Sequence, residues 1–148
     1  PHLLVSCRDK DGTDNALVVV YAGNCSLDPP MVMVGIVPAR HSYGLIKESG
    51  CFIVNLATQD QQKMYDYLGS HSGRNENKLA AIGAKTANGL WVNAPILTDC
   101  PVNIECSVVD SIRTGSHEML IGKIEYVHAD VEIVKEDGTV DWDRCALV

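Results

Sequence analysis

The sequence of 148 residues contains no apolar run long enough to cross a membrane. Its longest apolar runs, ALVVVYAG (16–23) and MVMVGIVPA (31–39), have the length of strands, whereas a membrane span needs roughly 18 apolar residues. No basic segment followed by an apolar stretch opens the chain, so we find no secretory signal. Because the chain begins with Pro1, we expect trimmed ends, and a targeting segment could have been lost with them. These features favour a cytoplasmic protein without a membrane partner.

Positive charge is scarce. The chain has 12 Lys and Arg against 19 Asp and Glu, which gives a formal net charge of −7. An acidic chain is a poor ligand for a polyanion, so nucleic acid is disfavoured as a partner. One small phosphate is not excluded, because local donors matter more than total charge.

Several familiar catalytic motifs are also missing. The sequence has no G-x-G-x-x-G, no phosphate-binding G-x-x-x-x-G-K-[ST], no H-E-x-x-H and no G-x-S-x-G. Its five histidines are scattered, and its six cysteines form no C-x-x-C pair, so no metal site is predicted. We favour reduced thiols, with disulfides and a catalytic cysteine as the alternatives. Hydrolase and metalloenzyme functions therefore lack support.

What the chain does contain is a succession of strand-like runs, with 46% hydrophobic and 21% charged residues. No repeat or linker divides it, so we expect a single domain over 1–148. The patterns predict helices at 41–50, 58–73 and 75–83, and a loop at 23–30. Strands are predicted at 3–7, 15–22, 31–37, 51–56, 90–97 (interrupted by Pro95), 101–115 and 116–134. Hairpin-like succession without βαβ alternation predicts a mainly β fold, an antiparallel barrel with α insertions.

The segment PARHSYGLIKESG (38–50) places Arg40 and Ser42 where a strand turns into a helix. A helix start presents free N–H groups and partial positive charge, which suit a phosphate. Arg40 can contact phosphate oxygens in a bidentate manner and Ser42 can donate through its hydroxyl. The alternative is that Ser42 only caps the helix and Arg40 is a solvated surface residue.

Five ordered blocks of the chain together resemble the flavin reductase-like, FMN-binding split-barrel family, and most closely its flavoredoxin-like branch. The blocks are RDKDGTDNALVVVYAGN, DPPMVMVGIVPARHSYGLIKESGCFIVNL, SGR, CPVNIECSVVDSIRTGSHEMLIGKIEYVHAD and EDGTVDWD. The resemblance implies a Greek-key split β-barrel, a homodimer, and FMN bound noncovalently near the dimer interface. The family chain usually continues past DWDRC, so we expect the C-terminal part of the domain to be missing or short.

The resemblance also implies which residues bind the cofactor. The family's phosphate-binding turn matches Arg40, Ser42 and Tyr43, and the strand that lines the flavin ring matches Asn15, Ala16, Tyr21, Ala22 and Asn24. Asn55 sits where the family presents a strand to the flavin; alternatively it is a strand-end residue tied to its own loop. Lys78 approaches the flavin or its phosphate, or else is a solvated helix lysine.

His117 is the candidate catalytic residue. In the family the block that matches GSH is commonly Gly-Asp-His and puts a histidine beside the flavin; here Ser116 replaces the aspartate. That exchange weakens any tuning of the histidine by a neighbouring carboxylate. The implied role is to position a nicotinamide or to donate to the polar edge of the flavin. The alternative is a partly buried strand histidine hydrogen-bonded to backbone.

The resemblance therefore implies an FMN-dependent oxidoreductase, a flavin reductase in which NADH or NADPH passes hydride to the flavin and electrons move on to an acceptor. One alternative is a flavoredoxin-type electron carrier that exchanges electrons with a redox protein partner without nicotinamide turnover. Another is a non-redox ligand-binding protein on the same barrel, since one fold hosts many functions.

Overall fold

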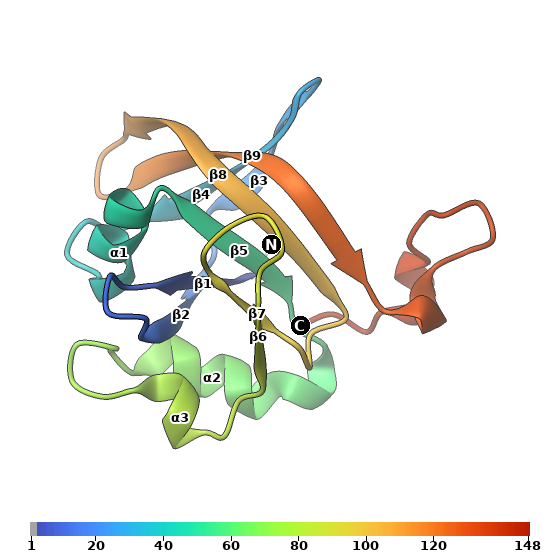
Figure 1. Cartoon of the computed structure of the whole chain (residues 1–148), viewed down its shortest axis with the longest axis horizontal. Coiled ribbons are helices and arrows are strands. Elements are labelled where there is room, and N and C mark those ends of the chain that lie inside the picture. The colour runs from blue at the N-terminus through green and yellow to red at the C-terminus, as the bar shows by residue number, and fades with distance from the viewer. Residues whose placement is uncertain (1–2) are drawn as a thin grey trace.

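The computed structural model describes residues 3–148, and seven antiparallel strands dominate it (Figure 1). Along the sheet the strand order is β2-β1-β5-β8-β9-β4-β3. The strands are β1 (Leu3–Arg8), β2 (Asp14–Val19), β3 (Ala22–Leu27), β4 (Pro30–Ile36), β5 (Cys51–Leu56), β8 (Val102–Arg113) and β9 (Glu118–Ala129). The predicted antiparallel β fold with helical insertions is confirmed.

A short segment of chain joins the two edges of the sheet. β2 and β3 lie at opposite ends of the strand order, yet only residues 20 and 21 separate them. At this bend the Gly35 amide of β4 donates to the Tyr21 carbonyl at 2.7 Å. The prediction of one strand over 15–22 was therefore wrong, because the chain changes partners halfway along to join the two edges of the barrel.

The loop predicted over 23–30 was also wrong. Residues 22–27 form β3, which pairs with β4 from Ala22↔Val34 to Leu27↔Pro30. Of the two prolines that suggested a loop, Pro29 lies in the hairpin turn after a cis peptide bond from Asp28, and Pro30 begins β4. A proline at the first residue of a strand leaves the remaining ladder intact.

Three helices lie outside the barrel: α1 (His41–Ser49), α2 (Gln62–Ser70) and α3 (Lys78–Ala81). Gly50 ends α1 with a left-handed φ of 73°, a conformation that glycine adopts readily at the end of a helix. Thr58 begins the 3-10 turn η1 (Gln59–Gln61) before α2, through a capping box with Gln61. In Figure 1, α2 and α3 lie together below β2.

Two apolar clusters hold these layers together. One fills the barrel around Phe52, and a Cβ at Gly122 would come within 2.5 Å of that ring, so glycine allows the close approach. The other cluster lies between the outer side of β1–β2 and the helices α2 and α3, and includes Leu4, Ala16 and Leu68. The helices are thereby fixed against β2.

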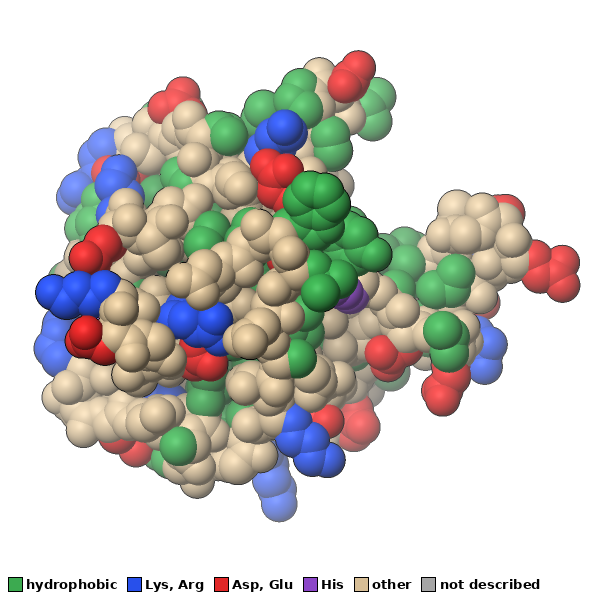
Figure 2. Space-filling model, viewed as in Figure 1, with side chains coloured by type: hydrophobic (Ala, Val, Ile, Leu, Met, Phe, Trp, Pro, Cys, Tyr) green, Lys and Arg blue, Asp and Glu red, His purple; other side chains and the backbone are tan. Residues whose placement is uncertain are grey.

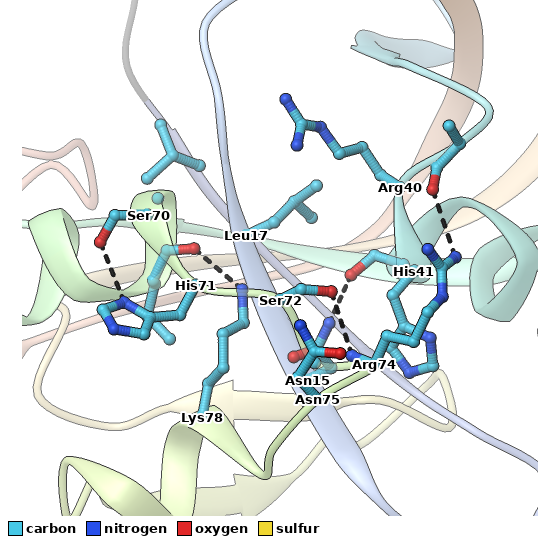
Figure 3. A pocket seen from close by; sticks show the side chains of 16 residues that line it. Asn15, Leu17, Arg40, His41, Ser70, His71, Ser72, Arg74, Asn75 and Lys78 are labelled. Carbon is cyan, nitrogen blue, oxygen red and sulfur yellow. Dashed lines mark hydrogen bonds between the residues drawn. The ribbon is translucent and has the colours of Figure 1, made fainter.

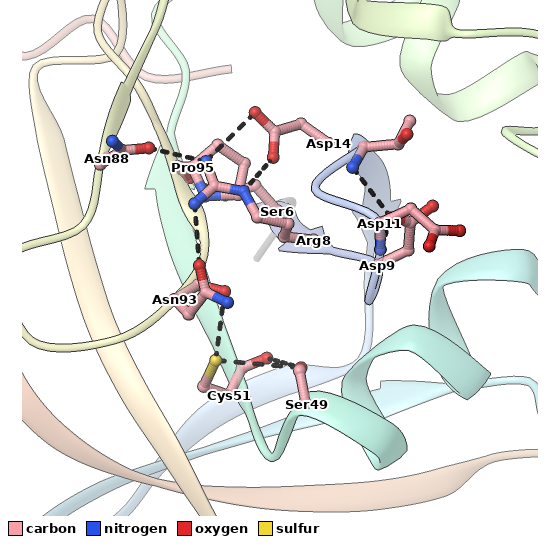
Figure 4. A network of polar contacts seen from close by, with 11 residues as sticks. Ser6, Arg8, Asp9, Asp11, Asp14, Ser49, Cys51, Asn88, Asn93 and Pro95 are labelled. Atoms are coloured by element: carbon pink, nitrogen blue, oxygen red, sulfur yellow. Dashed lines mark hydrogen bonds and ion pairs between the residues drawn. The ribbon is translucent and has the colours of Figure 1, made fainter.

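Arg8, the last residue of β1, links a small second sheet to the barrel. This sheet pairs β6 (Thr86–Asn88) with β7 (Pro95–Leu97), so only the end of the predicted 90–97 strand is a strand. The Arg8 guanidinium bonds Asp14 (Nε to Oδ1, 2.7 Å), Asn93 (2.9 Å) and Asn88 (2.9 Å) (Figure 4). The loop between β6 and β7 is thus held in a defined place.

Beyond β9 the chain forms an arm that projects from the barrel (Figure 1). It contains the 3-10 turns η2 (Val131–Ile133) and η3 (Trp142–Arg144), so the predicted strand over 116–134 ends at Ala129. The chain then returns to the body, where the Val148 amide donates to the Ala57 carbonyl at 3.0 Å. Within residues 3–148 no helix is long and apolar enough to span a bilayer. All six cysteines are free thiols.

Candidate functional site

A cavity of about 410 Å³ opens beside β2, between the start of α1 and the end of α2 (Figure 3). We call it the basic pocket. Although the chain carries a net charge of −7, the described residues that line the pocket include no Asp or Glu. They are Asn15, Leu17, Val18, Ala39, Arg40, His41, Ser42, Leu68, Gly69, Ser70, His71, Ser72, Gly73, Arg74, Asn75 and Lys78.

Three cationic side chains converge on this pocket from three different segments. Arg40 precedes α1 and is exposed, and its side chain has no hydrogen bond or ion pair within residues 3–148. Arg74, in the turn between α2 and α3, donates from Nη2 to the Ala39 carbonyl at 3.2 Å. Two arginines and a lysine, with no carboxylate among the described lining residues, form a site for a multiply charged anion, with planar guanidinium groups suited to phosphate oxygens.

Lys78 is not the solvated helix lysine that we considered as an alternative. Its residue is 2% exposed, and its Nζ donates to the Leu68 carbonyl at 2.9 Å (Figure 3). Burial lowers the pKa of Lys78 to about 8. An ammonium group held in so little water gains more from a nearby anion than a solvated one does.

Ser42 does not act as a helix cap. It lies inside α1, is 1% exposed, and α1 has no side-chain cap at its N-cap residue, Arg40. Asn15 Nδ2 donates to Ser42 Oγ at 2.7 Å, and the Ser42 hydroxyl also hydrogen-bonds the buried Cys7 thiol, so Ser42 is held in place at the wall of the pocket. The first amides of α1 also lack a side-chain acceptor, as an anion site at a helix start requires.

The carbonyl oxygen of the same asparagine is an orphan. Asn15 Oδ1 is buried and has no hydrogen-bond partner among the described residues. Gly73 lies against it, because a Cβ at Gly73 would be 2.5 Å from Oδ1. A buried acceptor without a donor is costly, so a ligand hydroxyl or amide reaching this floor would be stabilised.

Next to the basic pocket is a second, more apolar cavity of about 500 Å³, the His117 pocket. The Tyr21 and His117 rings meet edge to face with centroids 4.7 Å apart. His117 Nδ1 lies 2.8 Å from Ser116 Oγ, so the alternative of a ring bonded to backbone is not what the structure contains. The lining residues are Val20, Tyr21, Ala22, Met33, Thr114, His117 and Met119.

The two pockets follow one another along the same stretch of chain. Leu17 and Val18 line the basic pocket, and Val20, Tyr21 and Ala22 line the His117 pocket. At about 3.3 Å per residue, Leu17 and Tyr21 are separated by roughly 13 Å. One elongated ligand with an anionic end and a flat apolar end would fit this succession.

The structure brings seven of the predicted site residues to these pockets and leaves four elsewhere. Asn15, Arg40, Ser42 and Lys78 line the basic pocket, while Tyr21, Ala22 and His117 line the other. Ala16 is fully buried between β2 and the helices, and Asn24 lines a separate groove beside Cys25. Tyr43 Oη donates to Glu118 at 2.9 Å and does not line the basic pocket.

Asn55 is fully buried inside the fold, away from both pockets. Its Nδ2 donates to Ser6 Oγ at 2.9 Å, and its Oδ1 accepts from the Leu97 amide at 3.1 Å and from Asn103 Nδ2 at 2.8 Å. These partners lie on β1, β7 and β8, so Asn55 is not tied to its own loop either. It joins three neighbouring strands to β5.

Arg74 and Gly73 also line the basic pocket, and the sequence alone predicts no role for them. They belong to the short SGR block between two helical segments. A glycine beside an arginine in a connecting turn was the available signal, but the turn's position over Asn15 depends on how α2 packs on β2.

Comparison with known proteins gives a consistent result. The model of the flavin reductase like domain matches residues 1–144. Flavoredoxin of Desulfovibrio vulgaris (Miyazaki F) is 31% identical, with a TM-score of 0.92 over 97% of this chain and 77% of that chain. The FMN-binding protein of Thermus thermophilus with bound 1-cyclohex-2-enone is 26% identical, with a TM-score of 0.84 over 94% of this chain and 75% of that one.

Among curated sequences, the NADH:riboflavin 5'-phosphate oxidoreductase of Streptomyces pristinaespiralis is 26% identical over 82% of this chain and 66% of that protein. The curated relatives are longer than this chain. It spans between 48% and 72% of the lengths of four of them.

Proposed function

Because this chain belongs to the flavin reductase like domain family, we propose that it binds FMN across the two pockets and acts as an NAD(P)H-dependent flavin reductase. The observation that carries the proposal is the convergence of Arg40, Arg74 and Lys78, without a carboxylate among the described lining residues, beside a flat apolar pocket. The phosphate end of FMN would occupy the basic pocket. The ring would lie along Val20–Ala22 toward His117.

The donors and acceptors present fit such a ligand. Arg40 and Ser42 would hold the phosphate with Arg74 and Lys78, and a ribityl hydroxyl would donate to the orphan Asn15 Oδ1. Gly73 keeps that floor accessible. The apolar side chains of the His117 pocket would cover a face of the ring, and His117 would contact its polar edge.

When bound, FMN supplies the redox chemistry, accepting a hydride from NADH or NADPH and passing electrons to an acceptor. The chain's residues bind and orient it. The similarity to the Streptomyces NADH:riboflavin 5'-phosphate oxidoreductase supports a nicotinamide donor. His117, half-buried beside the exposed Tyr21, is the group available to orient the nicotinamide or to donate to the flavin.

The similarity to flavoredoxin favours a second candidate. In this alternative the chain binds FMN tightly and exchanges electrons with a redox protein partner, without nicotinamide turnover. Both candidates share the basic pocket, so steady-state oxidation of the nicotinamide distinguishes them.

The first experiment is a visible absorption spectrum of the purified protein reconstituted with FMN, followed by NADH and then NADPH without air. Rapid bleaching of the flavin bands supports the reductase and identifies the donor. Bands that resist both nicotinamides but bleach with a chemical reductant favour the carrier. A colourless protein that FMN does not bind would overturn both and leave a non-redox binding protein.

The phosphate assignment is tested by Arg40→Ala. A charge-assisted contact to phosphate contributes about 1.5–3 kcal/mol, so FMN affinity should fall roughly tenfold or more. The matched control is Arg144→Ala, which removes another exposed arginine, on η3. Riboflavin, which lacks the phosphate, should bind more weakly than FMN and should be insensitive to Arg40→Ala; equal affinities for the two flavins would reject the assignment.

We also propose that two copies of the chain associate. Leu90, Trp91 and Tyr126 are between 41% and 70% exposed, and the Trp91 and Tyr126 rings stack. Figure 2 shows a raised cluster of hydrophobic side chains beside the arm. An exposed apolar cluster of this kind is typical of a surface that another protein covers, and the family resemblance favours a second copy as its partner.

A further inference from the structure

One carboxylate connects α1 to the turn that carries His117. Glu118 Oε2 accepts from Tyr43 Oη at 2.9 Å and from Lys47 Nζ at 3.0 Å. Its side chain is 13% exposed, and Lys47 also reaches Ser111 Oγ on β8 at 3.4 Å. The Lys47 and Tyr43 hydrogen bonds lower the pKa of Glu118, which keeps it a carboxylate at neutral pH.

On the barrel side, this carboxylate belongs to a well-held strand end. Glu118 is the first residue of β9, pairs with Ile36 of β4 and Arg113 of β8, and directly follows His117. Thr114 Oγ1 donates to the His117 carbonyl at 2.9 Å, which closes the turn. A displacement of Glu118 would therefore move His117.

On the helix side, the partners of Glu118 begin directly beside the basic pocket. Tyr43 follows Ser42, and Lys47 lies four residues further on the same face of α1. Arg40 and Ser42 would be drawn toward any anion that binds. The first turn of α1 thus contacts the basic pocket through Ser42 and the His117 turn through Tyr43.

We propose that Tyr43, Lys47 and Glu118 form a bridge that couples occupancy of the basic pocket to the position of His117. Tyr43 and Glu118 are then positioning residues. Tyr43 holds Glu118 by a hydrogen bond and does not contact the phosphate. The inference rests on the proposed function, since it assumes a phosphate in one pocket and chemistry in the other. It adds that a phosphate bound in the basic pocket fixes the position of His117 in the other pocket through this bridge.

The test uses inorganic phosphate, which can occupy the basic pocket without filling the separate pocket that His117 lines. The ring signals of His117 are followed by NMR and assigned by their loss in His117→Asn. In the wild type, saturating phosphate should shift these signals. In Glu118→Ala the shift should be lost, while phosphate affinity, measured at the His41 signals, changes by less than about threefold.

Two further variants keep the result interpretable. Glu48→Ala removes another, exposed carboxylate from α1 and should retain the His117 shift. Tyr43→Phe leaves the Glu118–Lys47 pair in place and cuts the link beside Ser42, so it should also lose the shift. A shift that persists in both Glu118→Ala and Tyr43→Phe would overturn the bridge, as would a wild type whose His117 does not respond to phosphate. FMN titration of the wild type is independent: failure to bind FMN would overturn the proposed function instead.

Discussion

At the scale of the residue, the basic pocket depends on groups that the fold keeps short of partners. Among residues 3–148, the exposed Arg40 side chain has no ion pair, Asn15 Oδ1 accepts no hydrogen bond, and the buried Lys78 Nζ donates to one carbonyl. Burial destabilises Asn15 Oδ1 and the Lys78 ammonium, and a ligand that supplied the missing hydrogen bond or charge would offset this.

Lys78 makes flavin binding sensitive to pH. Burial lowers its pKa to about 8, and a bound phosphate favours the ammonium form, so binding raises that pKa. FMN affinity should therefore be greatest below about pH 8 and fall as pH rises through that value, because the complex must take up a proton that the free protein has lost. The phosphate is already a dianion above about pH 7 and adds no change there.

This prediction is checked by fluorescence titration of FMN from about pH 7 to about pH 9.5. Lys78→Met should bind FMN more weakly at pH 7 and show a flat profile over the same range. Riboflavin affinity should also be flat in the wild type. An identical fall in Lys78→Met would assign the pH dependence to another group.

Gly73 is predicted to be essential to the pocket floor. In Gly73→Ala the new methyl group would meet Asn15 Oδ1 at 2.5 Å and Nδ2 at 2.8 Å, so Asn15 must move and release Ser42. FMN affinity should fall by about tenfold in a titration. Gly44→Ala is the matched control, since nothing lies within 4 Å of its added Cβ and alanine favours the helix; equal losses in both would argue against a role for the floor.

Some of these residues could be predicted from the sequence and others could not. The position of Arg40 and Ser42 at a helix start could be predicted, because a proline, a polar turn and an amphipathic run define that start locally. The role predicted for Asn55 was wrong because the partners of its side chain depend on which elements surround β5. That strand pairs with β1 and β8, and β7 lies against it. The burial of Lys78 follows from the packing of a four-residue helix on β2, which has no local signal.

At the scale of the element, the loop between β6 and β7 is fixed by a buried carboxylate. Glu105 on β8 is fully buried and accepts from the amides of Leu90 (3.1 Å), Trp91 (2.8 Å) and Val92 (3.0 Å), and His128 Nε2 contacts it from β9. Burial alone would raise the pKa of Glu105, but His128 and these amides lower it overall. The loop therefore holds Trp91 stacked against Tyr126, with ring centroids 6.2 Å apart.

Glu105→Gln should destabilise the protein, because it removes the buried charge and turns one acceptor toward the loop into a donor. The loss should be on the order of 3 kcal/mol in free energy of unfolding, as for other buried charged groups that lose their hydrogen-bonded partner. Denaturant midpoints measure it. Glu125→Gln, on the less buried part of β9, is the control and should shift the midpoint little. A comparable shift in both variants would mean that the hydrogen bonds of Glu105 to the loop do not stabilise the fold specifically.

Local signals predicted the helices and the isolated strands better than the strands around the barrel closure. Gly50 and Thr58 set the ends of α1 and the start of η1 by chemistry within a few residues. The bend at residues 20 and 21 instead comes from the need to join β2 and β3 to different neighbours. That constraint is non-local, so an uninterrupted β-branched run gave no sign of it.

At the scale of the whole molecule, the barrel closure also explains why the two pockets are lined by one stretch of chain. The same bend that carries the chain from β2 to β3 places Leu17 in one pocket and Tyr21 in the other. The β8–β9 turn then brings His117 to the second pocket, and α1 brings Ser42 to the first. The site is thus a product of the closed sheet and could not be assembled from its separate segments.

The apolar surface beside the arm leads to a prediction about assembly. If Leu90, Trp91 and Tyr126 are covered by a second copy, the wild type should have twice the mass of the chain in light scattering. Trp91→Glu would bury a charge at that contact and should give the single-chain mass, because an unpaired charge in an interface costs several kcal/mol. Trp142→Glu is the matched control: Trp142, on the arm, is 52% exposed against 65% for Trp91. It should leave the mass doubled. A single-chain mass in the wild type would reject the association. If only Trp142→Glu lost the doubled mass, the contact would lie on the arm instead.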